Sequence, residues 1–371
     1  MPRFIIIGFF LSAFVFGAVV AAAPQPAVSQ LIKEKLADGV YLFRAPESLD
    51  RWTATNVVVV INDADVTVFD SNTRPSTTRL VIGEIRALTD KPVRTLINSH
   101  WHMDHWSGND EFVKAFPGIQ IIATVQTRDY MKRMGSGFLI ESSRQRLART
   151  RAALEGAMKT GKLSDGAPLT AEARRAMEED IAQTAAFVDE MAPLPRVLPD
   201  VAFNDSLTFW RGTREFRLFS ATGDATGSSV LYLPAEKIVV TGDVLVSPPG
   251  GSGPPPWTTN SFAITPWVAS LKDIEALDLA LIVPGQGPAM RDKSYLSRTI
   301  RLFSSIIGQV HATLERGVFR PDDVIATVNV EAIGLEYTPG EKQTSEAFKR
   351  WVASVTRKVI QESLDGILPS D

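Results

Sequence analysis

The sequence contains no cysteine and only four histidines among its 371 residues. The absence of cysteine excludes disulfide bonds, zinc–thiolate sites, cysteine-ligated iron–sulfur clusters and cysteine nucleophiles. Any metal ion must therefore be held by imidazole nitrogens and by oxygen ligands. Acidic and basic side chains are nearly balanced, at 42 against 39. This balance gives no electrostatic footprint for nucleic acid, and we expect no nucleic-acid partner.

Charge is also missing near the N-terminus. After Arg3, residues 4–23 form a largely apolar run without a charged side chain, and the run ends in three alanines before a proline. A basic start, an apolar stretch and a small-residue exit are typical of a secretory signal peptide. The alternative is an uncleaved anchor that spans the membrane once. We predict a cleaved signal peptide over residues 1–23, no stable membrane span after cleavage, and a periplasmic or secreted protein.

The rest of the chain alternates patterns typical of strands and helices, which indicates an α/β protein. In the first half, strands are predicted at 39–43, 56–61, 66–69, 93–98 and 119–124, with helices at 77–88 and 109–116. A second series of strands is predicted at 207–210, 216–220, 229–233, 238–241 and 279–283, with a helix at 267–277. Because both halves share the order strands, helix, strand and polar loop, the pattern favours a two-fold αββα sandwich.

Residues 126–192 interrupt this alternation and are predicted to be helical. Residues 141–162 carry six basic against two acidic side chains, whereas residues 172–190 carry six acidic against two basic ones. Opposite charges on consecutive helices suggest an antiparallel hairpin, although two separately solvated helix faces would give the same pattern. We predict one domain over residues 27–290 that contains this insertion, and a C-terminal helical extension over residues 291–371.

Three of the four histidines fall within six positions, at His100, His102 and His105. They follow the strand predicted over residues 93–98, where a buried strand gives way to a loop. Side chains two apart on an extended segment point the same way, so His100 and His102 can grip one ion. Asp104 and His105, at the turn into the next helix, are placed to reach a second ion.

The residues around these histidines resemble the metallo-β-lactamase-fold hydrolase superfamily. His100–Trp101–His102–Met103–Asp104–His105 matches its H-x-H-x-D-H signature, and four further motifs occur in the family's order within residues 39–290. These motifs are Asp70 at a strand end, Ser107–Gly108–Asn109 at a helix start, Thr241–Gly242–Asp243 after a strand, and the closing turn Pro284–Gly285–Gln286–Gly287. The resemblance implies a four-layer αββα sandwich with a helical insertion and C-terminal helices.

Two positions depart from the family pattern: Asp224 and Gln286 each stand where the family has a histidine. The resemblance implies a first ion at His100, His102 and Asp224. It implies a second ion at Asp104, His105, Asp243 and Gln286, with Asp243 shared by both ions. Aspartate still offers a ligand at the first site, a carboxylate oxygen in place of an imidazole nitrogen. Glutamine, in contrast, is a neutral and weak ligand. We therefore expect the second site to be the weaker one.

The ligand set leaves the nature and number of the ions open. Oxygen ligands in place of imidazole shift preference toward manganese or iron(II), whereas the family and the mixed histidine–carboxylate set favour zinc. We expect zinc as one or two ions, with manganese and iron as alternatives. Three states remain open at this point: two ions with an altered site, one ion, or a site too degraded to bind metal tightly.

The expected activity is hydrolysis by metal-bound hydroxide, because a bound cation lowers the pKa of water toward neutrality. Asp104 is the candidate catalytic residue that orients the nucleophile or takes its proton, and Asp70 is a candidate for fixing an imidazole. The expected substrate is a small molecule: an ester, thioester, lactone, phosphoester, sulfate ester or lactam. The alternatives are a non-catalytic periplasmic binding protein that reuses the fold, and a di-iron redox protein.

Aromatic and basic side chains near the motif are candidates for the walls of the substrate site. Trp101, Trp106 and Trp257 are the candidate aromatic walls, although tryptophans more often belong to a core. Tyr130, Lys132 and Arg133, at the start of the helical insertion, are candidate polar contacts; the simpler interpretation is a solvated helix face.

Overall fold

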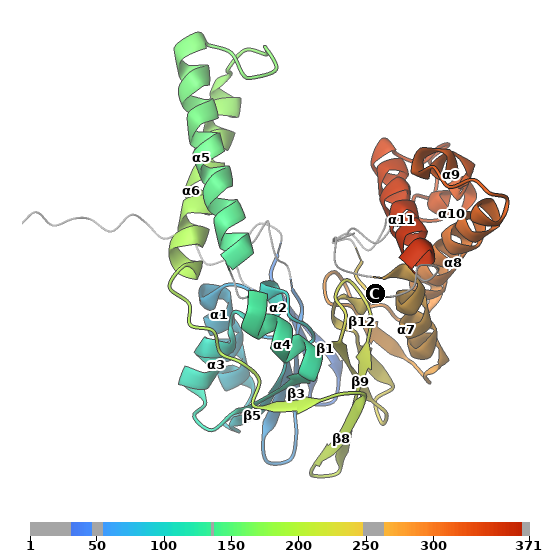
Figure 1. The fold of residues 1–371 in the computed structure, drawn as a ribbon. Helices are drawn as coiled ribbons and strands as arrows, with labels where there is room; N and C mark the ends of the chain where they lie inside the picture. Colours follow the sequence, from blue (N-terminus) through green and yellow to red (C-terminus); the bar gives the residue numbers. More distant parts are fainter. Residues whose placement is uncertain (1–30, 47–54, 135–136, 248–262, 366–371) are drawn as a thin grey trace, which may run out of the picture.

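The computed structural model describes residues 31–46, 55–134, 137–247 and 263–365. The predicted signal peptide and Trp257 lie outside these residues. Within them, the chain forms a seven-stranded sheet and a five-stranded sheet that face each other, with helices on both outer faces (Figure 1). The predicted αββα sandwich is therefore confirmed.

The first sheet is built from the N-terminal half of the chain, and its strands lie side by side in sequence order. Its strands are β1 (Ile32–Ala37), β2 (Val40–Arg44), β3 (Val57–Ile61), β4 (Val66–Phe69), β5 (Val93–Ile97), β6 (Gln120–Thr124) and β7 (Val201–Phe203). The β3–β4 hairpin is antiparallel, as the sequence predicts, whereas β4, β5, β6 and β7 run parallel. Strands β1 and β7 were not predicted.

The second sheet has the order β12-β11-β10-β9-β8. Its strands are β8 (Ser206–Arg211), β9 (Arg214–Ala221), β10 (Ser228–Leu233), β11 (Ile238–Val240) and β12 (Leu281–Val283). Only β11 and β12 are parallel, and helix α7 (Ile264–Ala276) lies between them in the chain.

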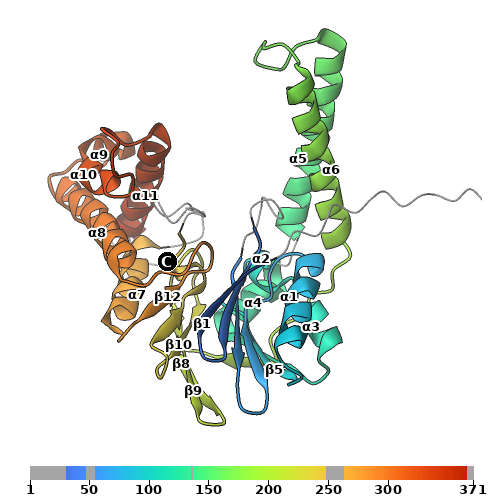
Figure 2. The same cartoon turned by 180° about the vertical axis from the view of Figure 1, so that it is seen from behind.

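The packing of β3 explains why its sequence is a continuous apolar run. Val58 and Val60 point into the core between the two sheets, and Val57 and Val59 point to the helices on the outer face. Successive side chains of a strand point to opposite faces, so a strand buried on both faces needs an apolar residue at every position. The outer face is covered by α1 (Pro75–Leu88) and α3 (Asn109–Ala115), as Figure 2 shows from behind.

Further helices cover the second sheet. They are α8 (Ser294–Glu315), α9 (Pro321–Thr327), α10 (Glu331–Leu335) and α11 (Glu346–Asp365). Side chains of α8 and α11 join α7 in one apolar cluster against this sheet. The helical patterns of α8 and α11 were predicted, whereas the short helices α9 and α10 were not. None of the helices in the described ranges is long and apolar enough to cross a membrane.

The insertion begins with α4 (Val125–Met134) and continues as a helical hairpin of α5 (Gly137–Thr160) and α6 (Ala171–Met191). The two helices run antiparallel and project away from the sandwich, as Figures 1 and 2 show. Arg146 of α5 forms an ion pair with Asp180 of α6 at 2.8 Å, and Thr170 caps α6 by accepting a hydrogen bond from the Ala173 backbone N–H. Opposite charges thus meet between the two helices, which decides between the two arrangements that the sequence leaves open.

The base of the hairpin is attached to the first sheet's helices through Glu190. Its carboxylate accepts a hydrogen bond from the Ser76 backbone N–H at 2.6 Å and pairs with Arg74 at 2.7 Å. Ser76 lies in the first turn of α1, where unpaired backbone N–H groups favour a negative charge. These contacts lower the pKa of Glu190: burial raises it, but the Ser76 N–H and the Arg74 guanidinium together outweigh that effect.

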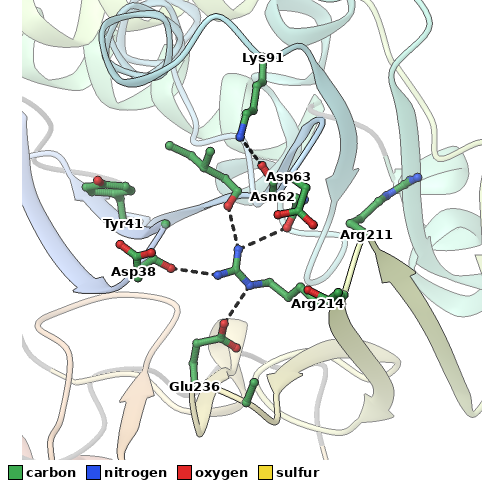
Figure 3. A pocket seen from close by; sticks show the side chains of 12 residues that line it. Asp38, Tyr41, Asn62, Asp63, Lys91, Arg211, Arg214 and Glu236 are labelled. Carbon is green, nitrogen blue, oxygen red and sulfur yellow. Dashed lines mark hydrogen bonds and ion pairs between the residues drawn. The ribbon is translucent and has the colours of Figure 1, made fainter.

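One end of the sandwich is held together by Arg214, shown at the centre of Figure 3. Its guanidinium donates hydrogen bonds to the backbone carbonyls of Asp38 and Ile61 and pairs with Glu236 at 2.8 Å. These partners lie in or next to three different hairpin turns, and a cavity of about 460 Å³ opens beside them. The polar groups of Arg214 are thus satisfied within the protein, which indicates a structural role for this end.

Candidate metal centre

The candidate ligands and Asp70, the residue expected to fix an imidazole, gather at the opposite end of the strands. Asp70 follows β4, the three histidines follow β5, Asp243 follows β11 and Gln286 follows β12. β4 and β5 are parallel, and so are β11 and β12. The loops that follow the two strands of each pair therefore leave the sheet at the same end of the strands. Asp224 reaches the same place from the loop between β9 and β10.

The local backbone at this end is built for close approach. Asp70 adopts a φ of +61°, in the left-handed region that side-chain-bearing residues rarely occupy and that is enriched at functional sites. Gly285 lies so near to Asp243 that a Cβ atom at this position would overlap the carboxylate. Glycine at position 285 therefore lets the turn after β12 pass directly beside Asp243.

One group of ligand atoms is formed by His102, Asp224 and Asp243, whose candidate atoms lie within 4.8 Å of one another. Nδ1 of His102 lies 3.6 Å from Oδ2 of Asp224 and 3.0 Å from Nε2 of His100. Oδ2 of Asp243 lies 3.9 Å from that same His100 nitrogen. His102 and Asp224 therefore lie together beside Asp243, whereas His100 forms a second group of this kind with His105 and Asp243.

A second group of atoms surrounds Nε2 of His105. This nitrogen lies 3.2 Å from Oδ2 of Asp104 and 3.4 Å from Oδ2 of Asp243. Nε2 of Gln286 lies 3.3 Å from each of the same two oxygens. The Nε2 atom of His105 and the two carboxylate oxygens are thus close enough for one cation to bind all three.

Unpartnered atoms at the same place also fit a cation. Within the described part of the chain, Nε2 of His105 and Oδ1 of Asp243 are buried and have no hydrogen-bond partner. Buried polar atoms of proteins are otherwise nearly always paired. Gln286 currently donates its amide N–H groups to the two carboxylates, and rotating the amide by half a turn would present its oxygen instead. The residues present therefore fit two cations that share Asp243.

Asp70 and Ser99 hold the histidines from behind. Oδ2 of Asp70 lies 2.7 Å from Nδ1 of His105, and Oδ1 accepts a hydrogen bond from the Ser99 backbone N–H at 2.7 Å. The Ser99 hydroxyl lies 3.0 Å from Nδ1 of His100 and 3.1 Å from Nδ1 of His105. Both imidazoles thus have Nδ1 engaged by the protein, which leaves Nε2 to face the ligand cluster.

The charges of the cluster favour a cation. Burial, together with the nearby histidines, lowers the pKa of His100 well below its usual value, so this imidazole is neutral and able to bind a metal. Burial also acts to lower the pKa of His105, but Asp243, Asp104 and Asp70 together raise it well above 6.5. The protein without a cation therefore holds a proton on His105 in the middle of several carboxylates. A metal ion would replace that proton.

The aromatic candidates have different surroundings. Trp106 is 3% exposed and belongs to the apolar cluster under the insertion, so it is a core residue. Trp101 is half-buried. The centre of its ring lies 4.3 Å from the centre of the His102 ring and 5.3 Å from that of Tyr130, on which it stacks. The guanidinium of Arg133 lies 4.7 Å from the centre of the Tyr130 ring, and Lys132 is exposed. Tyr130 is thus part of a row of side chains that runs from His102 through Trp101 to Arg133. The sequence does not reveal this row.

Ser99 and Thr55, whose hydroxyls contact side chains of the candidate ligands, were not identified from the sequence. Ser99 directly precedes the histidine motif, and that position is the only signal that could have found it. Thr55 is fully buried just before β3, and its hydroxyl donates a hydrogen bond to Oδ2 of Asp104 at 3.0 Å. No sequence pattern marks Thr55, because it lies far from every motif in the chain.

A two-sheet sandwich that gathers histidines and aspartates at the strand ends is an architecture of metal-dependent hydrolases. Residues 50–286 match the sequence model of the metallo-beta-lactamase superfamily, which is more than half of the chain. The chain belongs to this superfamily, which includes hydrolases such as lactamases and sulfatases.

Individual relatives are distant. A Pseudomonas protein described as a linear primary-alkylsulfatase is 23% identical over 278 residues, which are 73% of this chain and 49% of the relative. The chain thus spans about half the length of this curated relative. Two solved structures share the fold. A metallo-beta-lactamase from Pontibacter korlensis has a TM-score of 0.52 and 16% sequence identity, and the match covers 74% of this chain and 99% of that one. TMB-1 has a TM-score of 0.51 and 17% identity, and the match covers 75% of this chain and 98% of that one.

Proposed function

We propose that this protein is a metal-dependent hydrolase of small molecules, with sulfate esters as the preferred substrate class. The observation that carries the proposal is the arrangement of five candidate ligands in two groups that share Asp243, with Asp104 and Gln286 beside them. The sulfate-ester preference is supported by the alkylsulfatase relative, whose similarity extends over most of this chain. Zinc is the proposed ion, because it is commonly held by mixed sets of imidazole and carboxylate ligands.

The residues of the metal centre differ in their exposure, which indicates the side from which substrate can reach it. The exposed fractions of the side chains of Asp243 and Asp70 are 3% and 1%, whereas those of His102 and Asp104 are 19% and 15%. Substrate therefore reaches the centre on the side of His102 and Asp104. When bound, the cations supply Lewis acidity, which polarises the substrate and lowers the pKa of water.

Asp104 is proposed to orient the attacking water. Burial acts to raise the pKa of Asp104, but His105 and the other nearby donors outweigh it and lower the pKa below its usual value. The carboxylate is therefore ionised at neutral pH and can accept a hydrogen bond from water. His102 lies beside Trp101, so the substrate's leaving group is proposed to lie against the Trp101 ring.

Metal analysis combined with an activity panel tests this function. The full chain, purified without added metal, is analysed for transition metals and assayed on an alkyl sulfate, a phosphate monoester, a thioester, a lactone and a lactam. We expect at least one equivalent of zinc, hydrolysis of the sulfate ester, and loss of activity with a chelator that added zinc reverses. Less than about half an equivalent of any transition metal, with no hydrolysis in the panel, would favour a binding protein instead. A visible iron absorption band would favour a di-iron redox protein.

Export from the cytoplasm is a separate proposal, supported by the charge-free apolar run over residues 4–23 and its three terminal alanines. Fractionation of a bacterium that expresses the full chain, followed by N-terminal sequencing, tests it. We expect the mature protein in the periplasm or medium, with its first residue near Pro24. A full-length protein in the cytoplasm would contradict the proposal.

A further inference from the structure

Thr55 and Asn56 join the two halves of the sandwich beside the candidate metal centre. They immediately precede β3, in the first sheet, and the segment they contact follows β12, in the second sheet. Thr55 pairs with Gln286 in an antiparallel bridge. The Asn56 backbone N–H donates to the carbonyl of Gly285 at 2.8 Å, and its side-chain amide donates to the carbonyls of Pro284 and Gly287 at 2.7 and 2.9 Å.

Thr55 also contacts a ligand of the first half directly. Its hydroxyl donates to Oδ2 of Asp104 at 3.0 Å, and its carbonyl accepts a hydrogen bond from the Asn72 amide at 3.0 Å. The exposed fraction of Thr55 is 0%, so water does not compete for this hydroxyl. Thr55 therefore contacts two candidate ligands of the second ion, one from each half: Asp104 through its side chain and Gln286 through its backbone.

The position of this hydrogen bond matters for cation binding. Oδ2 of Asp104 is the same oxygen that lies 3.2 Å from Nε2 of His105. A carboxylate oxygen offers two lone pairs, so a donor on one side leaves the other free for a cation. The Thr55 hydroxyl thus holds the carboxylate with this oxygen toward His105 and Asp243 without filling the space between them.

We propose that Thr55 is a positioning residue that assembles the second cation site from the two halves of the fold. Its hydroxyl fixes the Asp104 carboxylate, and its backbone pairing fixes the turn that carries Gln286. The contacts of Thr55 among the described residues reach Asp104, Asn72 and Gln286. Because these include two candidate ligands of the second ion, we expect the affinity of the first site to change little when the hydroxyl is removed. This inference rests on the proposed metal dependence.

Stepwise zinc affinities of the full chain test the proposal without any activity assay. Zinc is titrated against a chromogenic chelator with the wild-type protein, Thr55→Val and Thr55→Ser. Valine keeps the branched shape without the hydroxyl, and serine keeps the hydroxyl. We expect Thr55→Val to weaken the weaker zinc site about tenfold, the scale of one hydrogen bond to a charged group. The tighter site should change less than about twofold, and Thr55→Ser should stay within about threefold of wild type at both sites.

Several outcomes would overturn the proposal. Unchanged affinity of the weaker site in Thr55→Val would do so, as would equal weakening of both sites or equal weakening by valine and serine. If Thr55→Val does not fold in the metal-free form, Thr55→Cys replaces it, because a thiol is a weak donor of similar size; an unchanged weaker site in that variant also overturns the proposal. A wild-type protein that binds no zinc contradicts the proposed function itself, whereas one that binds two ions with Thr55→Val unaffected contradicts only this inference.

Discussion

Nδ1 of His105 lies 2.7 Å from Oδ2 of Asp70, and the two side chains are 0% and 1% exposed. The pair is therefore shielded from water, and each group determines the state of the other. Burial raises the pKa of Asp70 more than the charge of His105 lowers it, so the ionised carboxylate depends on His105 for its stabilisation. This relationship fixes the ring of a candidate ligand before any cation binds.

Asp70→Asn should therefore weaken metal binding although Asp70 is not itself a ligand. The amide keeps the shape but removes the negative charge that fixes the imidazole. We expect zinc affinity to fall about 10–100-fold, the usual effect of losing a partner behind a metal ligand. Zinc competition with a chelator measures it. The control is Asp205→Asn, which changes an exposed carboxylate of the β7–β8 turn; equal affinities in the two variants would contradict the role of Asp70.

Gln286→His should strengthen the second zinc site. Gln286 faces Asp104 and Asp243 at 3.3 Å, so an imidazole at this position can replace a neutral, weak amide ligand. We expect the weaker zinc to bind about tenfold tighter, measured by stepwise titration. Gln361→His, on the exposed surface of α11, is the matched control. If zinc affinity does not change in Gln286→His, this position does not face the second ion.

Glu190→Gln should destabilise the protein in a way that depends on pH. Because the pKa of Glu190 is lowered in the folded state, its ionised form contributes stability above the ordinary value of 4.5, and that stability is lost as the pH falls through the lowered pKa. We expect Glu190→Gln to lower the free energy of unfolding by about 1 kcal/mol at pH 7. The difference from wild type should shrink toward pH 3.

Urea unfolding at pH 7 and pH 3 measures this effect. Glu179→Gln, on the exposed part of the same helix, is the control and should stay within about 0.5 kcal/mol of wild type at both values. A difference between Glu190→Gln and wild type that is equally large at both pH values would show that lost packing, and not the charge, causes it.

Arg214→Met should destabilise the fold without changing hydrolysis by the folded protein. The substitution leaves the Glu236 carboxylate and the carbonyls of Asp38 and Ile61 without their donor at the end of the sandwich opposite the metal centre. We expect a loss of about 2–3 kcal/mol in the free energy of unfolding, measured by urea denaturation. Arg217→Met removes an exposed ion pair with Glu215 and should leave the free energy of unfolding close to that of wild type. Equal losses in the two variants would contradict the structural role of Arg214.

Much of the fold follows from local patterns. The two apolar runs around residues 62–65 could form little other than a hairpin, and the structure pairs Val58 with Phe69 as that pattern requires. Strand β7 has only three residues, and β1 is half-exposed and carries charged side chains, so neither has the apolar pattern on which strand prediction depends. The helical hairpin was left open because its ion pair joins residues 34 positions apart, Arg146 and Asp180.

The candidate ligands were named from the sequence, but their supports were not. His100, His102 and His105 stand together in the chain, and their motif carries a chemical meaning by itself. Asp224, Asp243 and Gln286 were aligned through a resemblance, and the structure places all of them beside the histidines. Thr55 lies 49 residues from Asp104 and 231 from Gln286, and no local rule connects them.

The sequence by itself determined the class of chemistry: without cysteine, a cluster of imidazoles among carboxylates leaves nitrogen and oxygen as the only strong metal ligands. The order of strands and helices likewise determined the sandwich, because side-chain periodicity is a property of neighbouring residues. Only the tertiary structure decided which oxygen faces which nitrogen and which buried hydroxyl holds a carboxylate in place. Those relationships depend on two sheets packed face to face, and distances of 3 Å between distant segments are set by that packing and not by any local pattern.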